Sequence, residues 1–264
     1  RRALYAEMIL EDSPKAWNGY TPANFDREFH EPLSAAEALE ESRNIPAMVV
    51  LAKIGVDRAL GTLAAVGIHS PTRGGRTYGL SLAIGGAEVT PWEVAEGYAT
   101  LARGGEHRAA YLTARPAGDA AREDTVRILP QSICWDTLAA ISGRSRTQAV
   151  KGGEAAARRD AAWKTGTSSG FRDAWCAAVT PARTVVVWVG NAGGRGSSTL
   201  IGGEAAAPLA LHLIAAASPP PDPSAAAAPP WACRSATAPR EPAPDLDTAP
   251  VTAAQRLAIV SPVT

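Results

Sequence analysis

The apolar residues of this 264-residue chain change their period near residue 160, and this change constrains the fold most. Before it, apolar positions recur at helical spacing between recognisable helix start and stop signals. After it come three short runs rich in β-branched and aromatic residues, at 161–167, 174–180 and 184–190, and then a helical stretch at 204–217. This order predicts an α+β domain in which an antiparallel sheet is flanked by helices.

Two capping boxes mark helix starts. In Ser34-Ala-Ala-Glu37 and Thr90-Pro-Trp-Glu93, a hydroxyl and a carboxylate three residues apart can each accept a bond from the other's backbone N–H. Glycines should end these and neighbouring helices: one at 46–54, one at 57–66, and the one that begins after Thr90, which stops at 104–105. Residues 180–183 have the composition of a hairpin turn.

The composition divides the chain into three parts. Hydrophobic residues make up 46% of the sequence, enough for one large core, which we expect at residues 1–217. An Ala/Pro-rich stretch at 218–255 indicates an extended linker, and 256–264 resembles the start of a truncated C-terminal β module. Since the chain has no run of about 18 apolar residues, any membrane anchor should lie outside it.

Charge and residue usage exclude several function classes. Lys+Arg and Asp+Glu both number 26, so there is no basic excess for a nucleic-acid backbone. Three cysteines leave at least one unpaired within the chain, and the four histidines have no ligand spacing. We therefore expect no nucleic acid partner, no metal and no cofactor.

Lys164-Thr165-Gly166-Thr167 lies on a predicted strand and suits binding of a carboxylate. An ammonium and hydroxyls can hold the anion, while the glycine lets a substrate backbone come close. With only four lysines in the chain, this order is not expected by accident. The alternative is a polar edge strand without a binding role.

Ser42-Arg43-Asn44 lies between two predicted helices. A hydroxyl here could relay a proton, and an amide could hold a substrate carbonyl. Alternatively, Asn44 could simply cap the helix that begins at Ile45. A Ser-x-Asn triplet is common by chance, so its weight depends on the other motifs.

Ser-x-Asn followed by Lys-Thr-Gly is the order found in β-lactamases and penicillin-binding proteins. Longer segments carry a more specific resemblance, to the transpeptidase domain of class A bifunctional penicillin-binding proteins of the 1C type. The resembling segments are residues 24–47, 80–91 (LSLAIGGAEVTP), 163–175 (WKTGTSSGFRDAW) and 200–209 (LIGGEAAAPL).

The resemblance implies a penicillin-binding transpeptidase or serine β-lactamase-like fold and an acyl-transfer reaction. Ser42, Asn44 and Lys164 would be catalytic; Thr165, Gly166, Thr167 and Ser168 would bind substrate, with the Thr167 N–H as an oxyanion donor. Its implied partners are peptidoglycan stem peptides and lipid-linked precursor strands, with β-lactams as inhibitors. The implied location is the periplasmic face of the bacterial inner membrane.

The family's nucleophile motif, Ser-x-x-Lys, occurs nowhere in the 264 residues. Ser13-Pro-Lys15 has one residue too few. Because the segment after Arg1-Arg2 resembles the family segment that comes directly after this motif, we expect the motif just ahead of Arg1. The chain is then a transpeptidase domain truncated at both ends and inactive alone.

Two other functions stay open on the sequence alone. A serine β-lactamase would share the architecture and the short motifs. A non-catalytic peptidoglycan-binding pseudoenzyme would explain a groove without a nucleophile. Turnover of penicillin and the gene sequence upstream of Arg1 would distinguish these from a transpeptidase.

Overall fold

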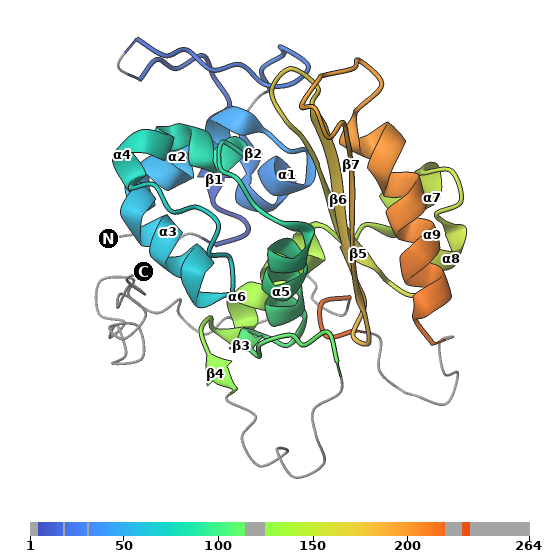
Figure 1. Ribbon diagram of the computed structural model, residues 1–264. Helices are drawn as coiled ribbons and strands as arrows, with labels where there is room; N and C mark the ends of the chain where they lie inside the picture. The colour runs from blue at the N-terminus through green and yellow to red at the C-terminus, as the bar shows by residue number, and fades with distance from the viewer. Residues whose placement is uncertain (1–4, 18, 31, 114–124, 220–228, 233–264) are drawn as a thin grey trace.

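The computed structural model describes residues 5–17, 19–30, 32–113, 125–219 and 229–232 (Figure 1). The expected β module at 256–264 and most of the 218–255 stretch lie outside the described residues. In chain order, the elements are β1 (Ile9–Leu10), β2 (Leu33–Ser34), α1 (Ala35–Glu40), α2 (Asn44–Ile54), α3 (Val56–Ala65), α4 (Gly75–Tyr78), the 3₁₀ helix η1 (Gly79–Ile84), α5 (Pro91–Ala102), β3 (Glu106–His107), β4 (Val126–Arg127), α6 (Gln131–Ala140), α7 (Arg144–Ala149), α8 (Glu154–Ala157), β5 (Ala162–Thr167), β6 (Asp173–Val179), β7 (Thr184–Gly190), the π-helical turn η3 (Gly202–Ala206) and α9 (Ala207–Ala217).

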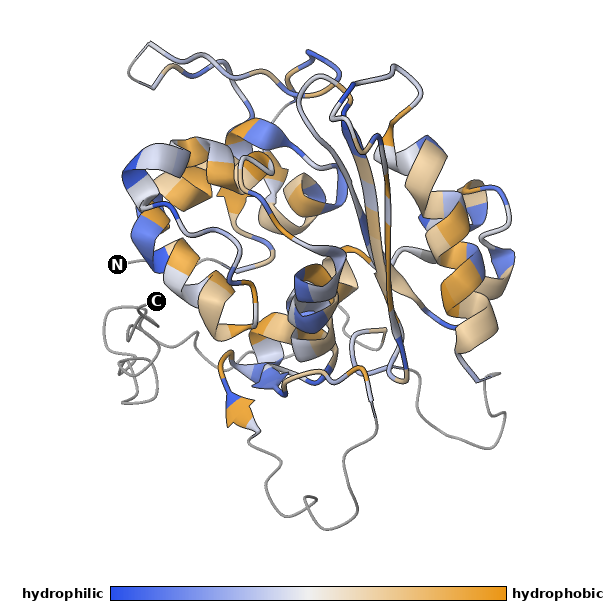
Figure 2. Ribbon diagram, in the orientation of Figure 1, coloured by the Kyte–Doolittle hydropathy of each residue, from blue (hydrophilic) through white to orange (hydrophobic). Residues whose placement is uncertain are grey.

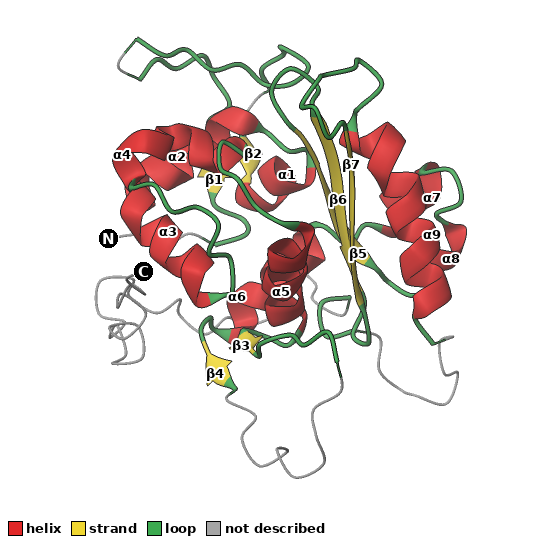
Figure 3. Ribbon diagram, in the orientation of Figure 1, coloured by secondary structure: helices red, strands yellow, loops and turns green. Residues whose placement is uncertain are grey.

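The main sheet has the antiparallel order β5-β6-β7 and lies between helices, as Figure 3 shows. The three predicted strands are therefore observed, and the α+β prediction is confirmed. Thr180 and Arg183 close the predicted hairpin turn, since each donates its backbone N–H to an oxygen of the other. In this arrangement β5, which carries the Lys-Thr-Gly-Thr motif, is an edge strand.

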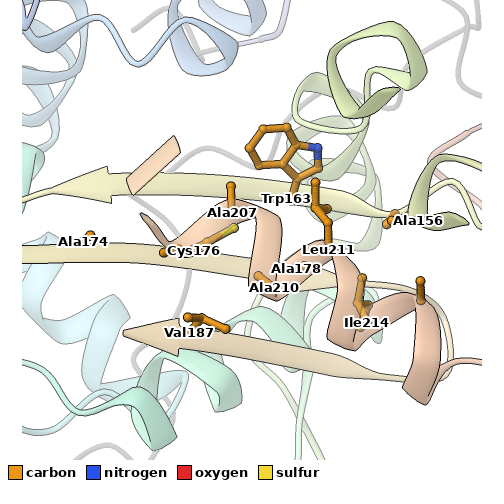
Figure 4. Close-up of a cluster of buried hydrophobic side chains, with 13 residues drawn as sticks. Ala156, Trp163, Ala174, Cys176, Ala178, Val187, Ala207, Ala210, Leu211 and Ile214 are labelled. Atoms are coloured by element: carbon orange, nitrogen blue, oxygen red, sulfur yellow. The ribbon is translucent and has the colours of Figure 1, made fainter. Parts of the chain in front are cut away.

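Two apolar layers fix the sheet between the helices. On one face, Trp163, Cys176 and Val187 pack against Leu211 and Ile214 of α9, a helix that is apolar along most of its length (Figures 2 and 4). The opposite face packs against α5 and α6 (Figure 1). Because successive side chains of a strand point to opposite faces of the sheet, apolar residues at alternate positions supply each of the two layers.

The local helix signals are observed where the sequence puts them. Both capping boxes form, at Ser34–Glu37 and at Thr90–Glu93. Gly55 separates α2 from α3 with a φ of 94°, a left-handed value that glycine adopts without the steric cost of a Cβ. α2 begins at Asn44, two residues before the predicted start.

The structure differs from the prediction of an unpacked linker at one point. Trp231, inside the 218–255 range, is only 1% exposed and contacts the cluster of Leu138, Ile141 and Val179. Its indole Nε1 donates to the Asp160 carbonyl at 3.1 Å. At this described position the chain packs on the core, because a large aromatic side chain such as Trp231 gains much from burying its apolar area.

Within the described residues, no helix combines the length and apolar character needed to cross a bilayer.

Candidate active site

An open groove of about 1450 Å³ runs between β5 and the start of α2. Its two walls come from distant parts of the chain, since Ser42 and Lys164 are 122 residues apart in sequence. All the candidate site residues line it: Ser42, Asn44, Lys164, Thr165, Gly166, Thr167 and Ser168.

The β5 wall owes its geometry to the sheet ladder. In an antiparallel pair, hydrogen-bonded and non-hydrogen-bonded residue pairs alternate along the strands. Ser168 donates its N–H to Asp173, and the register pairs Thr167 with Ala174. The N–H and C=O of Thr167 therefore point away from β6, at the free edge that borders the groove. An N–H in this position is free to face a bound carbonyl oxygen.

Lys164 reaches across the groove to the opposite wall. Its Nζ donates to the Ser42 Oγ and, at 2.9 Å, to the Thr165 carbonyl. Burial and the nearby Arg146 guanidinium lower the pKa of Lys164 to about 8. An amine with a pKa near neutrality can exchange a proton with a bound hydroxyl, as general acid–base chemistry requires.

Arg146 is held against the strand next to Lys164. Its guanidinium stacks 3.8 Å from the centre of the Trp163 ring, and Nη2 donates to the Trp163 carbonyl at 2.7 Å. Because Trp163 directly precedes Lys164, this contact keeps a positive charge close to the ammonium. No sequence motif pointed to Arg146.

The other β5 residues differ in how free they are to bind a ligand. Thr167 Oγ1 accepts the Gly202 N–H at 3.0 Å, and the Ser168 hydroxyl bonds with Asp173 at the β5–β6 turn. A Cβ on Gly166 would meet only Trp175 within 4 Å, at an ordinary 3.7 Å. The fold therefore does not need glycine there, and the missing side chain leaves room in the groove.

The facing wall is the turn that ends α1, where the Ser42 N–H donates to the Leu39 carbonyl at 3.2 Å and the Arg43 N–H to the Ala38 carbonyl at 2.9 Å, the Schellman pattern of a helix C-terminus. Ser42 has a left-handed φ of 59°, which is uncommon for a residue with a Cβ. Asn44 is not a cap: α2 begins at Asn44 itself, and the Asn24 Oδ1 accepts its N–H at 2.9 Å. The Asn44 amide donates to the Ala23 carbonyl at 2.9 Å, which leaves its second amide hydrogen for a ligand. The capping alternative for Asn44 is therefore wrong.

A buried polar network supports this turn. The Arg43 side chain is 4% exposed and donates to Asp12 at 2.8 Å, to Asp26 at 2.7 Å and to the Glu28 carbonyl at 3.0 Å. Asp12, whose side chain is fully buried, also accepts from Asn24 at 2.7 Å. These partners could not be found by sequence reasoning, because 31 residues separate Asp12 from Arg43 and no local spacing links them.

Two aromatic rings that line the groove contact each other. Phe25 comes from the loop before β2 and Phe171 from the β5–β6 turn, and their centroids lie 6.0 Å apart in an edge-to-face arrangement. This contact links the loop before β2 to the β5–β6 turn.

Asp26, Glu28 and His30 place potential ligand atoms within 4.8 Å of one another, all on exposed side chains. An Asp26 oxygen already pairs with Arg43, and His30 Nδ1 lies 3.2 Å from Glu41. Two of the three side chains therefore already have partners among the described residues.

The sequence matches known proteins along most of its length. The family model described as "Penicillin binding protein transpeptidase domain" matches residues 3–215. Penicillin-binding protein 1C of Escherichia coli is 31% identical over 208 residues, which are 78% of this chain and 26% of that protein. Penicillin-binding protein 1F of Bacillus subtilis is 27% identical over 194 residues, 69% of this chain and 26% of that protein. The chain thus spans about a quarter of the length of these relatives.

Solved structures share the fold. Penicillin-binding protein 1A of Haemophilus influenzae superposes with a TM-score of 0.68 at 20% identity, over 86% of this chain and 41% of that one. PonA1 of Mycobacterium tuberculosis in complex with penicillin V superposes with a TM-score of 0.65 at 22% identity, over 83% of this chain and 65% of that one. Together with the family match, this fold and groove show that the chain belongs to the penicillin-binding protein transpeptidase domain family.

Proposed function

We propose that this domain takes part in peptidoglycan cross-linking by serine acyl transfer, as the D,D-transpeptidase part of a longer penicillin-binding protein. The observation that carries the proposal is the contact between Lys164 Nζ and Ser42 Oγ across the groove. It joins the two motifs that the reaction needs and makes a path for a proton between the walls.

In this reaction a serine Oγ attacks the carbonyl carbon between the last two D-alanine residues of a stem peptide. The peptide bond breaks, D-alanine leaves with a proton, and the acyl group then passes to an amine of a neighbouring strand. The N–H of Thr167, at the free edge of β5, suits the developing oxyanion. Ser42 and Lys164 would move the proton, and the Asn44 amide would hold a substrate carbonyl.

The substrate-binding roles belong to the β5 wall. Thr165 and the ammonium form of Lys164 would hold the terminal carboxylate of the donor peptide, and Gly166 would let its backbone approach. Ser168 would contribute to substrate binding by holding the end of β5 in place, since its hydroxyl is bonded to Asp173 at the turn. β-Lactams would occupy the same groove as mimics of the donor, which agrees with the penicillin V complex of PonA1.

Peptidoglycan lies outside the bacterial cytoplasm, so the proposed site of action is the periplasmic face of the inner membrane. Stem peptides and lipid-linked precursor strands are the proposed partners there. The proposal of a bifunctional protein rests on the likeness to penicillin-binding protein 1C.

The nucleophile decides the first experiment. A covalent intermediate needs an activated serine, and the Ser-x-x-Lys spacing is absent from these 264 residues. Fluorescent penicillin and intact-mass measurement should therefore give no adduct with this chain. The full-length gene product should gain one penicilloyl mass per chain.

The other outcomes separate the alternatives. A stable penicilloyl mass on the 264-residue chain would contradict the roles given to the groove residues. No labelling of the full-length product would favour a non-catalytic peptidoglycan-binding protein. Rapid hydrolysis of penicillin by that product would identify a serine β-lactamase.

A further inference from the structure

The position of Ser42 depends on the backbone bonds that end α1, from the Ser42 and Arg43 N–H groups to the Leu39 and Ala38 carbonyls, and on the side-chain contacts that hold the two residues after it. A left-handed serine is strained and persists only where its surroundings determine it. Its Oγ contacts Lys164, so a small rotation of the turn would break the link between the two walls. The contacts of Arg43 and Asn44 therefore act together with these backbone bonds to preserve the link.

One buried carboxylate holds both of these residues. The Asp12 Oδ2 accepts from Arg43 Nε at 2.8 Å, and its Oδ1 accepts from Asn24 Nδ2 at 2.7 Å. Asn24 in turn accepts the Asn44 N–H at 2.9 Å. A third donor to Asp12, the His30 N–H, lies 3.2 Å from Oδ2. The bonds to Asp12 are all charge-assisted, and such bonds are strong and directional when they are buried.

We propose that Asp12 is a positioning residue, which fixes the Ser42–Asn44 turn through Arg43 and Asn24 and so keeps Ser42 Oγ on Lys164 Nζ. The proposal rests on the proposed function of the groove. Asp12 is not among the described residues that line the groove, so it acts through its neighbours and not on a substrate.

The first test uses the 264-residue chain and needs no activity. Four lysines make the ¹³Cε signals of labelled lysine easy to resolve, and Lys164→Met assigns the relevant one. In Asp12→Asn, water should replace Ser42 beside the amine, so the pKa of Lys164 should rise from about 8 toward 10.5. Asn24→Ser, which keeps the Asp12–Arg43 ion pair but removes the Asn24 bonds to Asp12, Glu28 and Asn44, should shift it less in the same direction.

Asp57→Asn is the matched control. Asp57 also accepts a backbone N–H, from Gly75 at 2.9 Å, but it does not line the groove. Its replacement should leave the Lys164 titration unchanged. If both Asp12→Asn and Asn24→Ser remain folded and also leave that titration unchanged, the positioning role is contradicted.

The second test uses the full-length gene product. Asp12→Asn should lower the limiting rate of penicillin acylation roughly 100-fold, the effect of misplacing a reacting group by about 1 Å. The non-covalent dissociation constant should hardly change, and Asp57→Asn should behave as wild type. If the wild-type product is not acylated, the proposed function fails, while the lysine titration still decides the role of Asp12. Normal acylation of a folded Asp12→Asn would overturn the positioning role.

Discussion

The two walls of the groove are built by different kinds of interaction. On β5, the strand alternation and the ladder with β6 set the direction of every group. On the facing wall, backbone bonds at the end of α1 hold a left-handed serine, and side chains from a loop much earlier in the chain hold the two residues after it. The first wall arises from a regular strand ladder, whereas the second combines a local helix end with long-range polar contacts.

This difference predicts where mutations act. A regular ladder is supported by backbone bonds, so a change of side chain on β5 should affect chemistry more than stability. A buried ion pair is different, because removal of one partner leaves the other charge without compensation. Changes on the Ser42 wall should therefore affect stability as well as chemistry.

The largest expected effect is on the β5 wall. Lys164→Ala in the full-length product should slow penicillin acylation by about 10³-fold, because the proton path to Ser42 is lost. The melting temperature should not fall. Stopped-flow acylation and thermal unfolding measure the two quantities. A large loss of stability with normal acylation would instead show that Lys164 is a structural residue.

On the Ser42 wall, by contrast, a mutation should lower stability. Arg43→Met in this chain should lower the free energy of unfolding by about 3 kcal/mol, because Asp12 would stay buried without its partner. Arg172→Met, at the turn after β5, removes only one exposed bond to the Ser169 carbonyl and should cost far less. Urea unfolding of both variants makes the comparison. Equal losses would mean that the two walls do not differ as described.

A smaller effect should appear in the pH dependence of stability. Lys164 has a pKa of about 8 in the folded chain and 10.5 as its ordinary value, so between these pH values the unfolded chain binds more protons. The contribution of Lys164 to stability therefore rises with pH across this window. Below the window the folded chain carries the full penalty of burying the protonated amine. Lys164→Met avoids the penalty and should be more stable than wild type by about 2 kcal/mol near neutral pH.

Urea unfolding of wild type and Lys164→Met at several pH values checks this linkage. The difference in unfolding free energy should shrink as the pH rises from about 8 to 10.5. A difference that does not change with pH would mean that Lys164 ionises alike in both states, and that the β5 wall carries no desolvated charge.

The two capping boxes illustrate how far sequence reasoning reaches. Both were predictable, because each needs only two residues three positions apart. Among the described residues, Glu37 bonds only with Ser34 at its own helix start, whereas Glu93 also accepts from His69 and Ser70. Burial opposes the ionisation of Glu93, but these bonds outweigh it and hold its pKa at about 2. Nothing in the motif itself distinguishes the local role from the long-range one.

Sequence alone was enough to predict the α+β class, the three strands, the two capped helix starts and seven of the residues that line the groove. The class, the strands and the capped starts depend on period and capping, which act between residues close along the chain, and the groove residues came from short motifs and the family resemblance. Only the tertiary structure decided that Asp12 and Asn24 hold the Ser42 turn, that Arg146 lies beside Lys164, and that Trp231 packs on the core. Such contacts join residues distant in sequence, and their energies come from burial, which a linear pattern does not specify.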